Sequence, residues 1–241
     1  MRRVRFLVPG DETPMDGHLV DDAVVSEHAT HRLADVRLLP PCTPTKIVCV
    51  GRNYAAHAAE LGNEVPEHPL LFLKPPSAVV GPEEPIVLPE SEEVHHEAEL
   101  AVVIGTRCRN VSAEEAMSVV LGYTCMNDIS DRVAQKWERN WVRAKAFDTS
   151  APLGPVLVTP DDAPSVFRIM CRVNGDIRQD GKTRDLIFDV PTLIVTISGI
   201  MTLEPGDVIA TGTPAGVGPL VRGDTVEIEI EGIGILRNPV T

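Results

Sequence analysis

The chain has 241 residues, enough for one large hydrophobic core or for one core with a small appendage. Hydrophobic residues make up 43% and charged residues 24%, as in average globular proteins, which excludes disorder on a large scale. The formal net charge of -13 argues against nucleic acid and anionic membranes as partners, because both would repel an acidic surface. A small acidic substrate is still compatible with this charge if a few lysines and arginines gather around it.

The cysteines and the apolar segments indicate a cytoplasmic protein. Five cysteines are dispersed and include no Cys-x-x-Cys pair, as expected for reduced thiols. The N-terminal residues lack the apolar core of a signal peptide. The most apolar later segment, residues 186–203, is interrupted by Asp189, Pro191 and Gly199 and is too short to span a bilayer. We therefore expect no membrane partner.

The beginning of the chain predicts a small β unit. Residues 4–8 and 18–25 alternate weakly between apolar and polar side chains and are separated by turn-forming residues. The proline-rich stretch 40–44 is a stiff connector. We place a domain boundary there, with a small N-terminal domain at residues 1–43 and the main domain at residues 44–241.

After the connector, strand patterns outnumber helix patterns. Asn174-Gly175 is a hairpin signal, and the Ser112–Glu115 capping box predicts a helix immediately after it. The order shows no regular strand-helix alternation and favours a mostly β or α+β fold over a Rossmann sheet. Strands are predicted at 46–51, 70–74, 94–104, 122–126, 167–173, 208–212 and 224–230, further helices at 55–61 and from Pro191 to about 201, and an irregular or helical segment at 132–141.

Two acids on the strand that begins near residue 94 suggest a cation site. Successive strand side chains point to opposite faces, so Glu97 and Glu99 share a face, with backbones about 6.6 Å apart. Two such carboxylates raise each other's pKa unless a cation lies between them. His95 shares the face, so spacing alone also permits a zinc-like His/Glu site. The strand that carries Glu227 and Glu229 has the same alternation on a solvated face, so the pattern by itself does not identify a metal site.

Six motifs, in a fixed order, carry a resemblance to a known family. They are Gly51-Arg-Asn-Tyr54 with His57 and Glu60, Phe72-Leu-Lys-Pro75, His95-His-Glu-Ala-Glu99, Asn127-Asp128 with Arg132 and Gln135, Ala144-Lys145, and Thr211-Gly-Thr-Pro-Ala-Gly-Val-Gly218. Together they closely resemble the fumarylacetoacetate hydrolase family, in its branch of acylpyruvate hydrolases and 2-hydroxyhepta-2,4-diene-1,7-dioate isomerases. The resemblance covers residues 46–241, and the segment before residue 45 resembles the small N-terminal domain of many bacterial and archaeal members.

This resemblance implies an α+β, mostly β fold, in which mixed β-sheets roll into a sandwich-like barrel, and a homodimer. It also implies a divalent metal held by Glu97, Glu99 and Asp128. An all-oxygen ligand set selects Mg²⁺, with Mn²⁺ or Ca²⁺ as alternatives, over zinc. With the family in view, His95 has a structural or supporting role, although it stays the residue whose part is least defined.

The remaining site residues are also implied by position. His57 and Glu60 correspond to a dyad on a lid helix that activates water, and Lys145 to the lysine that points at the metal. The glycine-rich segment 212–218 lacks a phosphate-loop or dinucleotide signature, so we reject nucleotide binding. The implied substrate-binding residues are Arg52, Tyr54, Lys74, Arg132, Gln135, Gly212 and Thr213.

The resemblance implies enolate chemistry on a small 2-oxo acid, in the breakdown of aromatic compounds. The leading hypothesis is metal-dependent hydrolysis of a carbon-carbon bond in acylpyruvate-like 2,4-dioxo acids, with a pyruvate enolate as leaving group. Isomerisation or decarboxylation of 2-hydroxy-diene-dioates, or decarboxylation of oxaloacetate, would use the same enolate. A hypothesis of a different class is an inactive member that only binds metal or serves a structural role.

Overall fold

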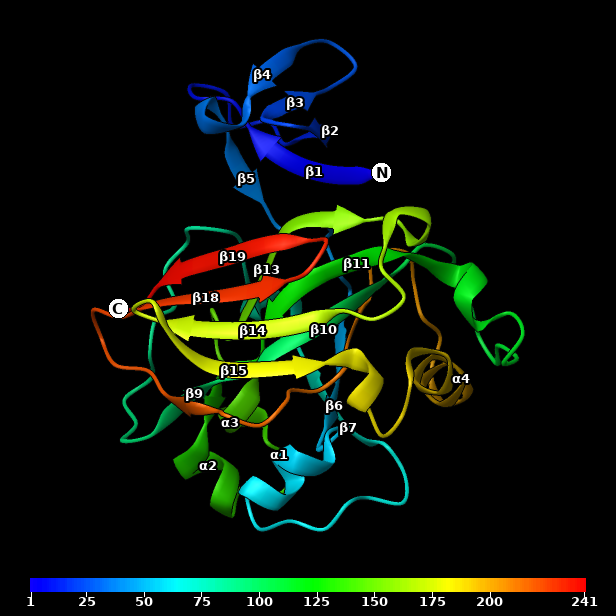
Figure 1. Ribbon diagram of the computed structural model, residues 1–241, viewed down its shortest axis with the longest axis vertical. Coiled ribbons are helices and arrows are strands. Elements are labelled where there is room, and N and C mark those ends of the chain that lie inside the picture. The colour runs from blue at the N-terminus through cyan, green and yellow to red at the C-terminus, as the bar shows by residue number, and fades with distance from the viewer.

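The computed structural model describes residues 1–241 and is built mainly from β-strands (Figure 1). The largest sheet has 12 strands, with the path β4-β3-β2-β1-β13-β11-β10-β16-β6-β7, and with β5 paired to β1 and β8 to β13. Its strands are β1 (Arg2–Leu7), β2 (Met15–Val20), β3 (Ala23–Val25), β4 (Thr30–Arg32), β5 (Arg37–Leu39), β6 (Ile47–Gly51), β7 (Leu70–Lys74), β8 (Val79–Val80), β10 (Ala98–Ile104), β11 (Val120–Asn127), β13 (Ala151–Val158) and β16 (Val208–Ala210).

Two smaller sheets and a few short helices complete the fold. One sheet has the order β12 (Ser130–Asp131), β9 (Val94–His96), β17 (Gly218–Pro219), and the other β15 (Asp176–Lys182), β14 (Arg168–Val173), β18 (Thr225–Ile230), β19 (Gly234–Pro239). The α-helices are α1 (Ala55–Glu60), α2 (Arg132–Trp137), α3 (Val142–Lys145) and α4 (Val190–Ile200). The 3-10 helices are η1 (Leu33–Asp35), η2 (Pro76–Ala78), η3 (Ala116–Val119), η4 (Pro160–Asp162) and η5 (Thr183–Asp185). No helix combines the length and apolar character needed to cross a bilayer.

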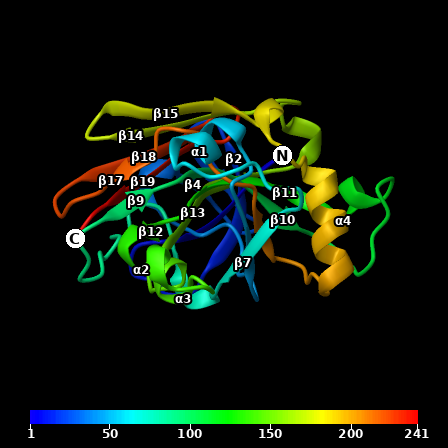
Figure 2. The same cartoon turned by 90° about the horizontal axis from the view of Figure 1, so that it is seen from below.

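The four-stranded sheet packs across one face of the large sheet (Figures 1 and 2). Strand β18 shows why: Val226, Ile228 and Ile230 are buried, whereas Glu227 and Glu229 alternate with them on the half-buried outer face. The inward side chains join those of β10, β11 and β14 in one cluster of 36 buried hydrophobic residues. Burial of each such aliphatic side chain stabilises the fold by about 1.5–3 kcal/mol.

Strand register brings distant polar residues to one edge of the large sheet. All seven residues of β10 are buried, which explains its nearly continuous apolar sequence. Strand β10 runs antiparallel to β11 with Ala98 opposite Asn127, so Asp128 follows directly beside Glu97 and donates its N–H to the Glu97 carbonyl at 2.9 Å. Strands β6 and β16 are parallel and end at the same edge, which is where Arg52 and Thr211 leave the sheet.

The N-terminal strands lie at the end of the molecule opposite to α1 and α2 (Figure 1). Strand β1 pairs with β13 through Arg2 opposite Val158, so the N-terminal unit extends the large sheet.

The predicted mostly β, α+β class is confirmed, with three corrections. The predicted strand 94–104 is interrupted at Glu97, because β9 and β10 on either side of it belong to different sheets. The sheets do not close into a barrel, because the terminal strands β4 and β7 of the path do not pair. The Ser112–Glu115 box does form, with Ser112 Oγ donating to Glu115 Oε2 at 2.9 Å. Only η3 follows it, since the chain enters β11 at Val120 and leaves no room for a longer helix.

One buried carboxylate fixes the start of β6 to the turn before β16. The Asp207 side chain accepts hydrogen bonds from Thr45 N at 2.9 Å, Thr45 Oγ1 at 2.7 Å, Lys46 N at 3.1 Å and Glu204 N at 2.8 Å, and it pairs with Lys46 Nζ. Burial alone would raise the pKa of Asp207, but these hydrogen bonds hold it below its usual value.

We expect Asp207→Ala to reduce the free energy of unfolding by about 3 kcal/mol, because it leaves several donors buried without an acceptor. Since the pKa of Asp207 is lowered by folding, its contribution is present above the unfolded pKa and is lost as pH falls through the folded pKa. Urea denaturation at pH 7 and at about pH 2.5 measures both effects, since the loss begins only below the ordinary Asp pKa of about 3.9.

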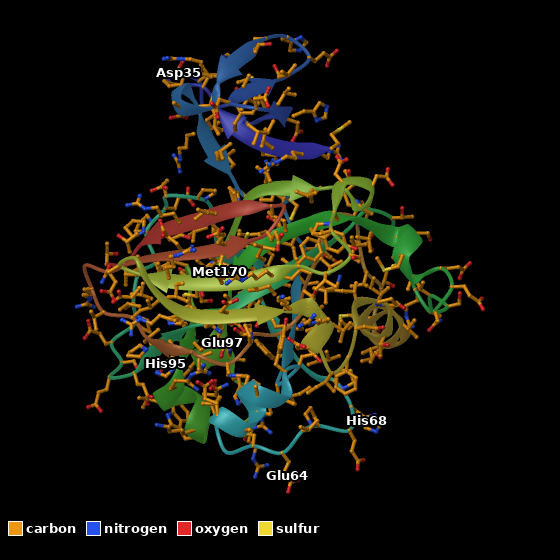
Figure 3. All side chains as sticks on the ribbon, viewed as in Figure 1. Asp35, Glu64, His68, His95, Glu97 and Met170 are labelled. Atoms are coloured by element: carbon orange, nitrogen blue, oxygen red, sulfur yellow. The ribbon has the colours of Figure 1, made fainter.

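Asp35→Ala provides the control, because Asp35 pairs with Arg32 on the exposed surface of the N-terminal unit (Figure 3). Its urea midpoint should stay close to that of the unaltered protein. Equal losses in the two variants would show that the Asp207 network does not stabilise the fold.

Candidate active site

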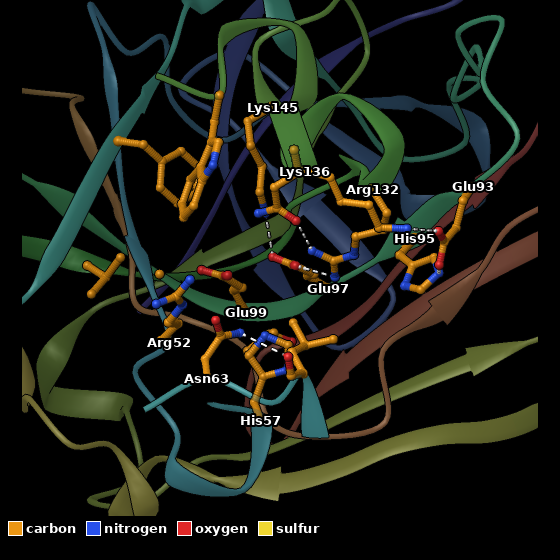
Figure 4. A pocket seen from close by; sticks show the side chains of 17 residues that line it. Arg52, His57, Asn63, Glu93, His95, Glu97, Glu99, Arg132, Lys136 and Lys145 are labelled. Carbon is orange, nitrogen blue, oxygen red and sulfur yellow. Dashed lines mark hydrogen bonds and ion pairs between the residues drawn. The ribbon is translucent and has the colours of Figure 1, made fainter. Parts of the chain in front are cut away.

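A cavity of about 330 Å³ opens at the sheet edge where β6 and β11 end and β10 begins (Figure 4). Eight of the residues predicted from the sequence line it. These are Arg52, His57, Glu97, Glu99, Arg132, Gln135, Lys145 and Thr213.

Three carboxylates converge beside this cavity. Oxygen atoms of Glu97, Glu99 and Asp128 lie within 4.8 Å of one another, and all three residues are buried. The β10–β11 register produces this arrangement, because it sets Asp128 beside Glu97, which lies between β9 and β10 and precedes Glu99 by two residues. An all-oxygen, buried donor set of this kind suits a hard divalent cation.

Two of the acids have side-chain cations as partners. Lys145 Nζ lies 2.7 Å from Glu97 Oε2 and 2.8 Å from Asp128 Oδ2, and Arg132 Nη2 lies 2.6 Å from Glu97 Oε1. Glu99 accepts only a backbone hydrogen bond, from Gly212 N at 2.8 Å. Glu99 is therefore the carboxylate whose charge the protein compensates least.

The pKa values follow this asymmetry. Burial would raise the pKa of Glu97, but Lys145 and Arg132 hold it below its usual value. Burial raises the pKa of Glu99 well above its usual value, and the charges of Asp128 and Glu97 raise it further. The pKa of Lys145 is raised, because Asp128 and Glu97 outweigh the opposing effect of its burial. A divalent cation would compensate the buried, closely spaced charges of the three acids, so the residues present fit such an ion.

His57 of the predicted dyad lines the same cavity from helix α1, whereas Glu60 is exposed and does not line it. His57 is buried, and its Nδ1 lies 3.3 Å from Glu60 Oε2. Figure 4 shows His57 across the acids from Lys145. The Glu60 carboxylate also accepts from Gly216 N, at 3.0 and 3.2 Å, which joins α1 to the 212–218 segment. Gly216 has φ +100°, and a Cβ there would lie 2.1 Å from Arg178 O, so the turn requires glycine.

Polar groups of several predicted substrate-binding residues reach the cavity. Arg132 Nη1 donates to Gln135 Oε1 at 2.8 Å, so the two side chains from α2 form one unit. Arg52 lines the cavity and makes no ion pair within the chain. Thr213 Oγ1 donates to Ala98 O at 2.9 Å, which fixes it at the cavity wall.

Three other predicted substrate-binding residues do not line the cavity. Gly212 contributes its backbone N–H to Glu99, with φ +98°. Tyr54 is buried, and burial raises the pKa of its hydroxyl, with the Glu99 charge adding to the shift. Lys74 is fully buried, and its ammonium is directed at Asp128 and at backbone oxygens. The geometry therefore gives Lys74 no direct access to a substrate.

His95 lines the cavity but lies outside the acid cluster. Its Nε2 is 3.2 Å from Glu93 Oε1, and the group of possible metal ligands contains Glu97, Glu99 and Asp128 alone. Burial and the nearby Arg132 lower the pKa of His95. The zinc-like arrangement that spacing permitted is therefore not formed.

Gln179, on β15, was missed by the sequence analysis. Its Nε2 donates to Thr213 Oγ1 and to Pro214 O, both at 2.7 Å, and its Oε1 accepts from Ala98 N at 3.0 Å. The same oxygen lies 3.0 Å from Nδ1 of His96, whose pKa burial lowers to about 4. The Asn174-Gly175 hairpin predicted the strand, but no local signal marked this glutamine.

An aromatic wall was also missed. Phe72 and Trp141 meet edge to face with ring centroids 5.5 Å apart, and both line the cavity. Their separation in sequence hides the pair, because only the tertiary fold brings β7 beside the N-terminus of α3.

Comparison with known proteins decides the family. Residues 46–241 match the model of the fumarylacetoacetate (FAA) hydrolase C-terminal domain. This chain belongs to the fumarylacetoacetate hydrolase family. The match begins close to the end of the proline-rich connector.

Relatives across this family are enzymes of related reaction types. The chain is 42% identical over 253 residues to the mitochondrial oxaloacetate tautomerase FAHD2A of Bos taurus, covering 98% of this chain and 79% of that protein. The structure of 2-hydroxyhepta-2,4-diene-1,7-dioate isomerase from Mycobacterium marinum is 43% identical with a TM-score of 0.89, covering 100% of this chain and 98% of the other. Maleylpyruvate hydrolase from Sphingobium sp. SYK-6, solved with manganese(II) and pyruvate, is 36% identical with a TM-score of 0.85, covering 100% and 99%.

We expect Glu99→Gln to separate metal binding from stability. A carboxyl whose pKa is raised in the folded state destabilises the metal-free fold as pH rises above the unfolded value. Removing this charge should stabilise the metal-free protein near pH 7, yet weaken Mn²⁺ binding by at least about a hundredfold, since a direct ligand is lost. Urea denaturation in EDTA and calorimetric Mn²⁺ titration measure the two effects.

Glu227→Gln is the matched control, because Glu227 has the same strand alternation on the outer face of β18. It should change neither quantity appreciably. Mn²⁺ affinity that survives Glu99→Gln would exclude Glu99 as a ligand.

Proposed function

We propose that this protein is a divalent-metal-dependent enzyme that hydrolyses a carbon-carbon bond in acylpyruvate-like 2,4-dioxo acids through an enolate. The observation that carries the proposal is that His57, paired with Glu60, lines the same cavity as Glu97 and Glu99 of the acid cluster. A site that only bound a metal would need the acids but would have no use for a buried histidine held by a carboxylate beside them.

The dyad supplies a general base. When Nδ1–H of His57 donates to Glu60, the lone pair on Nε2 is free to accept a proton. Glu60 fixes this tautomer and stabilises the imidazolium that forms. We propose that His57 deprotonates the water that attacks the distal carbonyl of the substrate.

The cavity also provides positive groups for an anionic substrate and for the enolate. A bound Mg²⁺ or Mn²⁺ would be held by Glu97, Glu99 and Asp128 and would supply Lewis-acid stabilisation of negative charge on substrate oxygens. Arg132, Gln135 and Thr213 line the cavity where the 2-oxo acid head would lie. Arg132 and Gln135 donate hydrogen bonds to its carboxylate, whereas the hydroxyl proton of Thr213 is already bonded to Ala98 O. Lys145 stabilises the enolate charge that develops as the carbon-carbon bond breaks.

Arg52 fits the other end of a diacid. Its guanidinium is the cation at the cavity that has no ion pair in the chain, whereas Arg132 and Lys145 pair with the acids and Lys136 pairs with Glu93. We propose that it binds a distal carboxylate of the substrate. An ion pair between Arg52 and this carboxylate explains how a protein of net negative charge can bind a dianion.

Isomerisation is the second candidate reaction, because the named relatives include an oxaloacetate tautomerase and a diene-dioate isomerase. The same His57 would then move a proton between carbon and oxygen of the enol, and no water would attack. Both reactions pass through an enolate, so the acid cluster and Lys145 have the same function in each.

Substrate turnover tests the proposal. We expect Mg²⁺- or Mn²⁺-dependent release of pyruvate from acetylpyruvate, abolished by EDTA and restored by Mn²⁺, in a lactate dehydrogenase-coupled assay. Enol-to-keto conversion of oxaloacetate, followed by ultraviolet absorbance, reports isomerisation. Loss of enol absorbance without pyruvate formation would favour the isomerase, and no turnover by metal-loaded protein would favour an inactive binding protein.

We expect His57→Ala to reduce acetylpyruvate hydrolysis by about a hundredfold to ten-thousandfold, because the general base is lost. Decarboxylation of oxaloacetate needs no attacking water and should survive. Mn²⁺ affinity should be unchanged, since His57 is not among the acids that form the cluster.

His68→Ala is the control, since His68 is exposed on the loop after α1 (Figure 3). Retention of hydrolysis in His57→Ala would show that another group is the base.

A further inference from the structure

We propose that Lys74 is a positioning residue whose ammonium group holds Asp128 and the backbone of Lys145 in the geometry that binds the divalent cation. The proposal rests on the metal site of the proposed function. This role replaces the direct substrate contact expected for Lys74, because the Lys74 ammonium group lies behind the acids and does not line the cavity.

Lys74 is the last residue of β7, and its ammonium is enclosed by oxygen atoms. The side chain is fully buried. Four oxygen atoms lie within hydrogen-bond distance of its three N–H groups: Ser150 O at 2.8 Å, Ser150 Oγ at 3.0 Å, Ile129 O at 3.2 Å and Lys145 O. An ammonium group that is buried away from water needs hydrogen-bond acceptors in place of its hydration shell. Here Ile129, Lys145 and Ser150 supply these acceptors.

The same ammonium reaches a metal-binding acid. Lys74 Nζ lies 2.8 Å from Asp128 Oδ1, an ion pair without hydrogen-bond geometry, while Lys145 Nζ donates to Asp128 Oδ2 at 2.8 Å. Each oxygen of Asp128 therefore faces a different lysine. Because Lys74 also binds the backbone oxygen of Lys145, it fixes both the acid and the residue that carries the second cation.

The position of Lys74 distinguishes this role from substrate binding. Lys145 lines the cavity, whereas Lys74 does not. Ser150 Oγ donates to Lys145 O at 2.8 Å, which adds a second hold on the same carbonyl. Lys74 thus acts on the substrate only through the residues that it orients.

A role of Lys74 as a simple counter-charge and a role as a positioning residue predict opposite changes in metal affinity when Lys74 is removed. Lys74 repels a divalent cation held by Asp128, so removal of a mere counter-charge would strengthen metal binding. Removal of a positioning residue would weaken it, because Asp128 and Lys145 would no longer be fixed. Supporting residues around metal ligands typically contribute about 10–100-fold to affinity.

The test compares Mn²⁺ affinity, measured by electron paramagnetic resonance on full-length protein after EDTA dialysis, in Lys74→Met and in Lys46→Met. Methionine keeps an unbranched side chain of four heavy atoms and removes the ammonium group. Lys46→Met is the matched control, because it also removes a lysine paired with a buried acid, Asp207, but Lys46 contacts none of the acid cluster. Oxalate, which presents the two oxygens of a 2-oxo acid head, is then titrated at saturating Mn²⁺.

We expect Lys74→Met to weaken Mn²⁺ binding by at least about tenfold while oxalate affinity at saturating Mn²⁺ changes less than threefold, and Lys46→Met to leave both unchanged. Unchanged or stronger Mn²⁺ binding in folded Lys74→Met would overturn the proposal, and weakened oxalate binding alone would restore a direct substrate contact. An equal loss of Mn²⁺ affinity in Lys46→Met would also overturn it, as a general structural effect.

Ser150→Ala keeps the test decisive if Lys74→Met does not fold. It removes one contact with Lys74 Nζ and one with Lys145 O, and we expect Mn²⁺ binding about two- to threefold weaker. Unchanged affinity in this variant would overturn the proposal. Failure of the unaltered protein to bind Mn²⁺ would instead contradict the proposed metal dependence, and this inference with it.

Discussion

Three carboxylates buried within 4.8 Å of one another are the constraint on which the rest of this structure depends. Burial of like charges is strongly unfavourable unless cations compensate them. The chain meets this demand with Lys145, Arg132 and Lys74, each placed 2.6–2.8 Å from an acid. The short segments between β11 and β13 carry Arg132, Lys145 and the backbone oxygens that surround the ammonium of Lys74, which itself comes from β7.

The charges of the three acids are compensated unevenly. Glu97 and Asp128 each have side-chain cations, whereas Glu99 has a backbone N–H. The fold therefore retains one carboxyl that favours a proton when no metal is bound. A divalent cation would compensate this carboxyl. The same group that destabilises the metal-free protein therefore favours the binding of a cation.

The four-stranded sheet supports the site from the other side. Gln179 on β15 holds Thr213 and Pro214, and Glu60 on α1 holds Gly216. The 212–218 segment is therefore fixed at both ends by side chains from elements that are remote in sequence. This arrangement connects helix α1, the acid strand and the outer sheet, so that His57 and the three acids keep fixed relative positions.

The sequence by itself determined which residues share a strand face and which short motifs occur in order. Strand alternation placed Glu97 and Glu99 together, and the motifs named the family and the cavity residues His57, Arg132 and Lys145. The same local pattern surrounds Glu227 and Glu229, because alternation fixes the face of a side chain but not what lies opposite that face. Strand β13 was not predicted, since Pro152 and Pro155 are unfavourable in an isolated strand.

Only the tertiary structure decided the partners. The β10–β11 register, the enclosure of Lys74 by oxygens and the hold of Gln179 on Thr213 join segments far apart in the chain. Lys74 belongs to a motif that indicated substrate binding, yet its surroundings place it behind Asp128. A sequence motif specifies a side chain's chemistry, whereas burial and long-range contacts determine what that chemistry acts on.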